Sequence, residues 1–294
     1  SSNTTAGENT AVGRASMENT TTGAANTAVG YSSLENQNFT TATDSHNTAV
    51  GFKAGHNVTT GVQNTLIGSL AGDALTDADF NVAVGKDALG QDTLGSTSTA
   101  IGHSALAVQN FTTATSTFNT AVGFSAGNVL TTGTSNTLLG ARSGDALTTG
   151  SLNVAVGLDA LTTDTAGNRS TAIGLNALQT QNFSTSTLVY NTAVGYEAGK
   201  NVTTGTLNTL IGATAGDALT VGGSNVSLGY FSLTADTKGS KSVAIGTAAL
   251  GDQNFTTATD TYNVAVGQEA GRSVTTGINN TLIGGLAGDA IITA

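Results

Sequence analysis

The sequence predicts an all-β fold: a parallel β-solenoid of about 16 coils, each 17 or 21 residues long. Two observations predict it. A glycine that closes a Thr-Ala-Val-Gly-like motif returns along the whole chain, first at Gly13, Gly30, Gly51, Gly68 and Gly85. Its residue number rises by 17, 21, 17 and 17, and this series then repeats. The motif Gln-Asn-Phe begins at residues 37, 109, 181 and 253, a constant difference of 72 in residue number. Short self-similar units indicate a solenoid, because one unit cannot bury its apolar side alone and must stack on its neighbours.

The repeat organisation predicts one continuous array over residues 1–294, since no change of composition marks a domain boundary. Groups of four coils form four super-repeats with this period of 72, three of them complete at approximately residues 47–118, 119–190 and 191–262. The chain opens on a partial coil (Thr4, Thr5, Gly7) and closes on another (residues 291–294). We therefore expect it to be a fragment of a longer protein.

Composition excludes several classes of partner. The formal net charge is −10 and the sequence pI is about 4.4, whereas nucleic-acid binders gather Lys and Arg on one face. The longest apolar runs are a few residues, far below the roughly 20 that a membrane-spanning helix needs. We expect no nucleic-acid partner and no membrane insertion of this fragment. The absence of cysteine excludes disulfide bonds.

The first position of each coil is Asn in 13 of the 16 coils, including Asn47, Asn64 and Asn81. Ser replaces it in the other three, at Ser98, Ser170 and Ser242. Stacked coils place these side chains one above another at the strand spacing of about 4.8 Å. We expect a ladder that satisfies polar groups of the turns.

Positions two to four read Thr-Ala-Val or a close variant, which predicts a short strand whose two faces are both apolar. One face can belong to the core of the coil, and the other needs a second cover that a single solenoid does not supply. We expect the fourth position, as in Val122 and Ile173, to point into the core. The third position is then expected at an oligomer interface, a set that includes Ala49, Leu66, Ala121, Leu138, Ala193 and Leu210.

The fifth position is glycine in all 16 coils, including Gly51, Gly68, Gly85 and Gly102. Such regularity indicates a backbone bend with positive φ, or an approach too close for a Cβ atom. Many coils also carry Thr at position thirteen with Gly two places later, as in Thr59 and Gly61. This pattern predicts a second short strand ending in a second turn.

Residues 98–105 (Ser-Thr-Ala-Ile-Gly-His-Ser-Ala) and 242–249 (Ser-Val-Ala-Ile-Gly-Thr-Ala-Ala), together with the Asn-Thr-Ala-Val-Gly segments, resemble the repeat of YadA-like head domains in trimeric autotransporter adhesins. Similar arrays occur in bacteriophage tail fibres. The resemblance covers nearly the whole chain and implies a left-handed β-roll, a homotrimer and an extracellular place on a virion tail fibre or a bacterial cell surface. The adhesin repeat is shorter than either kind of coil in this chain, and the choice between phage fibre and adhesin stays open.

The chain offers little for catalysis or for a cofactor. His46, His56 and His103 are its only imidazoles, and no P-loop, HExxH, GxSxG or EF-hand pattern occurs. His46 takes the place of Phe118, Tyr190 and Tyr262 in later super-repeats, so we expect ring packing from it. The recurring Asp73, Asp145, Asp217 and Asp289 are predicted to cap turns; a cation bound between chains is the alternative. We expect no enzyme, no catalytic residue, no cofactor and no metal ligand.

The four-residue insertions are the candidate ligand-contact loops. Phe39, Phe111, Phe183 and Phe255 each precede a second ring, such as Tyr190 or Tyr262, by seven residues. These rings are candidates for contact with cell-surface glycans or a receptor, because aromatic faces suit sugar rings. The structural alternative is a small hairpin whose two aromatic side chains pack together.

Three functions are compatible with this pattern. The first is a structural and adhesive fibre segment that presents or spaces a receptor-binding region. The second is an ice- or surface-binding solenoid that uses the Thr ladder at position thirteen. The third is a fibre that contacts or cuts polysaccharide. Cleavage requires paired carboxylates, and the only candidates close together in the sequence are Asp77 and Asp79.

Overall fold

The computed structural model describes residues 7–293, so Thr4, Thr5 and Ala294 of the partial terminal coils lie outside the described residues. Those described form strands and turns, with no helix among them. The prediction of an all-β parallel solenoid is confirmed. The chain divides into two compact units, residues 1–149 and 150–294, and repeats of the same kind fill both.

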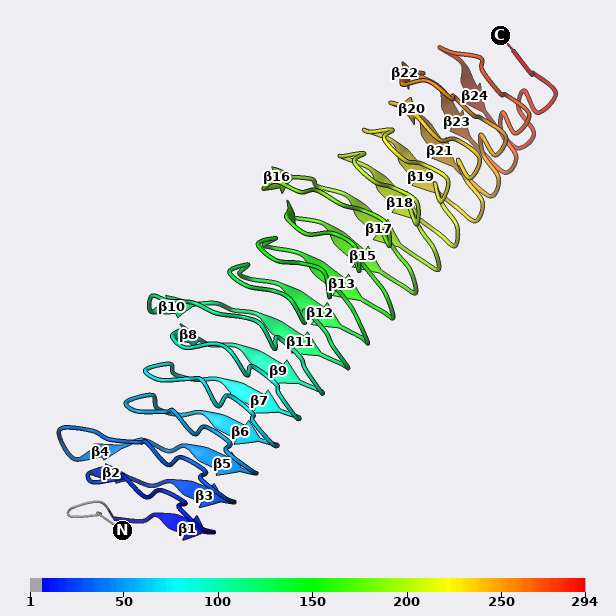
Figure 1. Ribbon diagram of the computed structural model, residues 1–294. Helices are drawn as coiled ribbons and strands as arrows, with labels where there is room; N and C mark the ends of the chain where they lie inside the picture. The colour runs from blue at the N-terminus through cyan, green and yellow to red at the C-terminus, as the bar shows by residue number, and fades with distance from the viewer. Residues whose placement is uncertain (1–6, 294) are drawn as a thin grey trace. The chain divides into compact units, whose positions relative to one another are not determined.

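The first unit contains a parallel sheet of three-residue strands, one from each coil, which Figure 1 shows in blue to green. Its strands follow the order of the chain in the sheet: β1 (Thr10–Val12), β3 (Thr27–Val29), β5 (Thr48–Val50), β6 (Thr65–Ile67), β7 (Val82–Val84), β9 (Thr99–Ile101), β11 (Thr120–Val122) and β12 (Thr137–Leu139).

The second unit repeats this arrangement. Its parallel sheet is formed by β13 (Val154–Val156), β15 (Thr171–Ile173), β17 (Thr192–Val194), β18 (Thr209–Ile211), β19 (Val226–Leu228), β21 (Val243–Ile245), β23 (Val264–Val266) and β24 (Thr281–Ile283).

Pairing joins equivalent positions of successive coils. Ala49 in β5 lies opposite Ala28 in β3 and Leu66 in β6, and the other pairs keep the same register. The longer coils keep this register because their extra residues bulge away from the sheet. Side chains at one coil position therefore form a row with a spacing of about 4.8 Å.

Within residues 7–293, second strands occur only beside the insertions. Four two-stranded parallel sheets pair β2 (Gly23–Ala24) with β4 (Thr43–Asp44), β8 (Gly95–Ser96) with β10 (Thr115–Ser116), β14 (Gly167–Asn168) with β16 (Thr187–Leu188), and β20 (Gly239–Ser240) with β22 (Thr259–Asp260). The prediction of a second strand at position thirteen is wrong, because Thr59 and its counterparts lie in turns and bends. The insertions are not hairpins either, since each pairs in parallel with the preceding coil.

The fifth-position glycine has both properties that the sequence predicts. Gly51 has φ of +141°, and a Cβ atom built on it would lie 2.4 Å from the carbonyl oxygen of Gly68 in the next coil. Real Cβ atoms do not approach backbone that closely. Glycine is required here because coils stack at this corner backbone on backbone.

The coil interior is narrow and is filled by the third-position side chain. Most coils have Ala there, and the larger Leu66 fits because Gly55 and Gly72 leave room for it. A Cβ atom on either glycine would lie 2.7 Å from a methyl carbon of Leu66. Where Leu34 or Leu89 occupies the equivalent place to those glycines, the third position is Ala. The super-repeat is therefore, in part, an alternation of large and small core residues.

The predicted asparagine ladder is present, and it works mainly through the backbone. The backbone amide of Asn64 donates to Oδ1 of Asn47 at 2.8 Å, while Nδ2 of Asn47 donates to the carbonyl oxygen of Gly61 at 2.8 Å. The amide of Ser98 donates to Oδ1 of Asn81 in the same way. Asn47, Asn64 and Asn81 each thus satisfy one donor of the next coil and one acceptor of their own.

Candidate interaction surface

The two apolar faces of the strand have the opposite roles to those expected. In β12, Leu138 is completely buried and its neighbour Leu139 is 45% exposed. In β11, Ala121 is buried and Val122 is partly exposed. The prediction that Val122 and Ile173 point into the core is wrong. So is the placement of Ala49, Leu66, Ala121, Leu138, Ala193 and Leu210 at an interface, since all six are buried inside their coils.

The outward face is wider than the strand itself. In the coil around β17, Tyr190, Thr192, Val194 and Tyr196 are exposed or partly exposed, and they alternate with buried Asn191 and Ala193. We use the term outer sheet face for the side chains at four places in each coil. These are the residue before the first-position Asn or Ser, positions two and four, and the residue after the glycine.

Most exposed large apolar side chains of residues 7–293 lie on this face. The edge before the asparagine carries Phe80, Phe118, Leu152, Tyr190, Leu207 and Tyr262. The centre carries Val12, Ile67, Ile101, Leu139, Ile173, Leu228 and Ile283. The edge after the glycine carries Tyr31, Phe52, Phe124, Leu158, Leu175, Tyr196 and Tyr230. A contiguous apolar patch of this kind marks an interaction site, because soluble monomers rarely leave more than a few hundred Å² of it exposed.

Ring contacts order both edges of the outer sheet face along the coils. Tyr31 and Phe52 stack with ring centroids 5.5 Å apart, and His103 stacks on Phe124 at the same separation. On the other edge, a guanidinium nitrogen of Arg169 donates to the Tyr190 hydroxyl at 2.7 Å, and its Cζ lies 5.5 Å from the ring centroid. Such contacts restrict the rotamers of side chains that are otherwise open to solvent.

The insertion phenylalanines do not form a contact ridge. Phe39, Phe111, Phe183 and Phe255 are only 7–9% exposed, because their rings cover the edge of the coil. Phe118, expected to pack on Phe111, is instead 62% exposed. Of the candidate contact residues, Tyr190 and Tyr262 remain accessible, and both belong to the outer sheet face. Sequence reasoning missed Phe124 and Tyr196, although the alternation around the glycine could have indicated them.

The threonine ladder at position thirteen uses its hydroxyl groups internally. The Thr59 hydroxyl donates to the carbonyl oxygen of Thr76 at 3.2 Å, and the Thr76 hydroxyl donates to that of Thr93 at 3.0 Å. The same bond recurs from Thr131 to Thr148 and from Thr203 to Thr220. These hydroxyls stabilise the stack of turns, so they are not a free array for an external ligand.

The periodic aspartates accept local hydrogen bonds, which fits the expected turn-capping role. Asp217 accepts a hydrogen bond from its own backbone amide and another from the Thr234 hydroxyl in the next coil. Asp73 has Gly90 in place of that threonine, which leaves a hollow of about 400 Å³ lined by Asp73 and Asp87. Burial raises the pKa of both Asp73 and Asp217 above the ordinary value.

Replacing Gly90 with threonine is expected to fill this hollow and stabilise the protein. A Cβ atom at Gly90 would have the Asp87 carbonyl oxygen as its nearest neighbour at 3.3 Å, and the Asp73 Oδ1 atom at 3.6 Å. The loss of glycine flexibility and the new hydrogen bond should together raise the free energy of unfolding by about 1 kcal/mol. Urea denaturation measures the change. Gly90→Val is the matched control, and equal stabilisation by valine would contradict a role for the hydroxyl.

A buried carboxylate network near each later insertion was not anticipated. Oδ1 of Asp92 accepts hydrogen bonds from the backbone amides of Gly95 (3.1 Å) and Phe111 (3.0 Å), and its Oδ2 accepts from Nε2 of Gln109. Oε1 of Gln109 accepts from Nδ2 of Asn119 at 2.9 Å. Asp164 and Asp236 have the equivalent partners, one and two super-repeats later. In the first super-repeat Thr20 takes the aspartate's place, and its hydroxyl has no partner.

Acidification is expected to preserve or increase stability. Burial raises the pKa of Asp164, as it does for Asp73 and Asp217, although hydrogen bonds from Gln181 and from backbone amides oppose the shift. A carboxyl with a raised folded pKa stabilises the fold below its unfolded pKa of about 4, and this contribution is lost as pH rises through the folded value. The pKa of Glu197 is lowered, chiefly by a hydrogen bond from Lys200. This ion pair lies at the surface, so its contribution to stability is small.

The melting temperature should therefore be at least as high at pH 4 as at pH 7, as circular dichroism can measure. Asp217→Asn keeps an acceptor for Thr234 and should flatten part of this pH dependence. A melting temperature that falls steadily on acidification would contradict the expectation.

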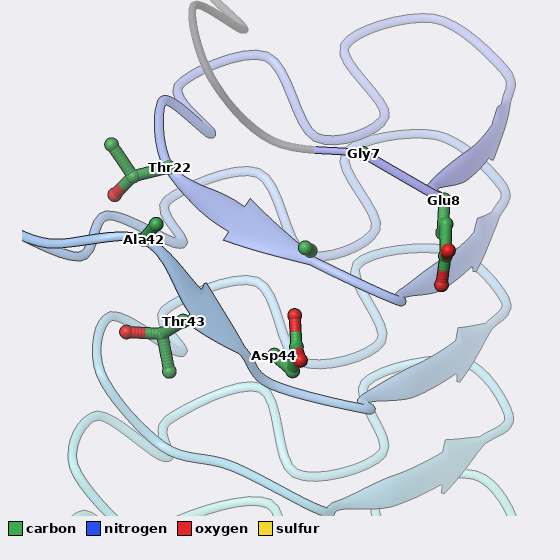
Figure 2. A pocket seen from close by; sticks show the side chains of 7 residues that line it. Gly7, Glu8, Thr22, Ala42, Thr43 and Asp44 are labelled. Carbon is green, nitrogen blue, oxygen red and sulfur yellow. The ribbon is translucent and has the colours of Figure 1, made fainter.

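A second hollow lies at the N-terminal end of the described residues. It measures about 460 Å³ and is lined by Gly7, Glu8, Thr22, Ala24, Ala42, Thr43 and Asp44. Figure 2 shows that its two carboxylates, Glu8 and Asp44, come from separate segments. Asp77 and Asp79 have separate hydrogen-bond partners: Asp77 accepts from the Thr60 hydroxyl, and Asp79 accepts from the backbone amide of Val62.

Within residues 7–293, no group of three or more His, Cys, Asp or Glu side chains is placed to hold a metal ion. That part of the chain also has no helix of the length and apolarity needed to cross a membrane. Comparison of the chain with family models, curated proteins and solved structures finds no match.

Proposed function

We propose that this chain is a structural and adhesive fibre segment, a homotrimer that presents or spaces a receptor-binding region on a virion or bacterial cell surface. The observation that carries the proposal is the outer sheet face. It carries most of the exposed large apolar side chains of residues 7–293, it has the same geometry from coil to coil, and none of the described residues covers it. The extracellular location follows from the resemblance to YadA-like head and tail-fibre repeats.

The size of the outer sheet face supports self-association. The six residue steps across the face span at most about 20 Å, and less because the chain bends at the fifth-position glycine, while coils repeat about every 4.8 Å. Each coil thus offers up to about 100 Å², and the coils of either unit together offer up to about 800 Å². A stable protein interface buries about 800 Å² per partner. The area of the face is therefore of the order that a stable assembly needs.

The choice of three chains rests on the resemblance to YadA-like head repeats, which implies a homotrimer. In a closed cyclic assembly each chain joins one patch to a different patch of the next chain, so every outer sheet face turns toward a common axis. Valine, isoleucine and leucine at position four would supply the packing there.

Sedimentation equilibrium of the purified chain tests the proposal. We expect a mass three times that of the 28.9 kDa chain over a wide concentration range. A monomer would contradict the proposed fibre assembly.

Two other uses of the outer sheet face would give different results. Second-position threonines such as Thr48 and Thr65 point outward in a row, which favours ice or surface binding by a monomer. Thermal hysteresis of a monomeric solution would support that alternative. Contact with glycans would use accessible rings such as Tyr190 and Tyr262, and a glycan array read with Tyr190→Ala would show it. Both alternatives need a face that the trimer would cover.

A further inference from the structure

We infer that the two edges of the outer sheet face recognise each other between copies, coil by coil and in register. The residue before the asparagine in one chain packs against the residue after the glycine in the same coil of the next chain. This inference rests on the proposed self-association and adds the residues that set its register.

The two edges match in size within individual coils. Phe118 and Phe124 flank the same strand, β11, and are 62% and 57% exposed. Leu152 and Leu158 flank β13, and Tyr190 and Tyr196 flank β17, all of them exposed. Around β12, by contrast, both edges are small, with Ser135 and Ala141. Other coils combine a larger residue with a smaller one, as Ala25 does with Tyr31, so the matched coils carry the register.

A stagger of one coil loses most of this match, although Leu152 would then face Leu175. Phe118 would then face Ala141, Tyr190 would face Ala213, and Ser135 would face Leu158. The opposite stagger sets Ser135 against Phe124. Aromatic pairs stabilise a contact beyond the effect of their buried area, and a ring facing alanine leaves a void. The in-register arrangement is therefore favoured at the coils with matched edges.

Register also decides whether the assembly closes. Edge-to-edge contact between different patches is heterologous, and such contacts form a ring when the rotation closes and a filament when it does not. A stagger repeated at each contact would shift every chain along the axis and leave the ring open. Matched edges thus favour the in-register contact, which closes the ring, over the staggered contacts, which leave it open.

Cysteine cross-linking tests the register, because the chain has no native cysteine. Ser135→Cys and Ala141→Cys are combined in one chain. The strand β12 between these positions sets the Cα atoms of Asn136 and Gly140 about 13 Å apart, whereas a disulfide needs Cα atoms within about 7 Å, so Ser135→Cys and Ala141→Cys cannot bond within one chain. After mild oxidation we expect a covalent trimer on denaturing non-reducing gels.

The controls separate the register from the assembly. Ser135→Cys combined with Phe124→Cys or with Leu158→Cys reports the two staggered arrangements, and Ser135→Cys alone reports a face-to-face dimer. Cross-linking of a control in preference to the in-register pair, in an oligomer of unchanged mass, would overturn the inference and leave the proposed function standing. A monomeric mass with no cross-link in any variant would overturn both.

Discussion

Replacing Gly123 with alanine is expected to unfold the coils around it. Gly123 has φ of +142°, and a Cβ atom there would lie 2.5 Å from the carbonyl oxygen of Gly140 and 2.6 Å from its carbonyl carbon. Both contacts are with backbone, so no side chain can move to relieve them. Separating the two coils would break the hydrogen bonds of β11 with β12. We expect a loss of more than about 4 kcal/mol, an exceptional value for a single methyl group.

Gly285→Ala is the matched control. The nearest atom to a Cβ there is the carbonyl oxygen of Gln268 at 4.0 Å, and its φ is not in the left-handed region. Urea denaturation followed by circular dichroism should show a large loss for Gly123→Ala and little change for Gly285→Ala. If both variants unfold at the same urea concentration, close glycine stacking is not what holds the coils together.

The coil length, the strand and the glycine bend could be predicted from the sequence because each repeated pattern has only one structural interpretation. The direction of the strand's side chains could not. Ala121 and Val122 are both apolar, so alternation alone does not tell the inside from the outside. The decisive quantity is the volume of the coil interior, which accepts Ala121 and, only beside glycines, Leu138. The position that is alanine in most coils faces the narrow interior, and this rule would have predicted the correct direction of the side chains.

The accessible rings and the buried carboxylates were harder to anticipate for a different reason. An aromatic residue in a loop reads as exposed, yet Phe111 closes the coil edge and Phe118 points outward. Asp92 reads as a surface residue until its partners are known. One signal was present: Asp92, Asp164 and Asp236 each stand one coil length before the glutamine of Gln-Asn-Phe. Periodic spacing of a carboxylate and an amide by one coil length indicates stacked, bonded side chains.

Lysine substitution of two adjacent leucines in β12 is expected to have opposite consequences. Leu138 is completely buried, with its methyl carbons between Gly127 and Gly144. A charged ammonium there would lose its hydration without gaining a partner, and Leu138→Lys should cost at least about 4 kcal/mol and unfold the surrounding coils. Leu139 is 45% exposed on the outer sheet face, so Leu139→Lys should leave the fold of the chain intact.

Leu139→Lys is expected to separate the chains of the oligomer, whereas Leu138→Lys is expected to unfold the chain itself. With Leu139→Lys, three like charges would meet near the proposed axis, and we expect a folded monomer with a circular dichroism spectrum like that of the parent. With Leu138→Lys, the β signal itself should be lost at temperatures where the parent remains folded. If Leu139→Lys still sediments as the parent oligomer, the outer sheet face is not the interface. If Leu138→Lys stays folded, the third position does not fill the core. Because the two positions are adjacent in one strand, composition and coil number are constant, and only the direction of the side chain differs.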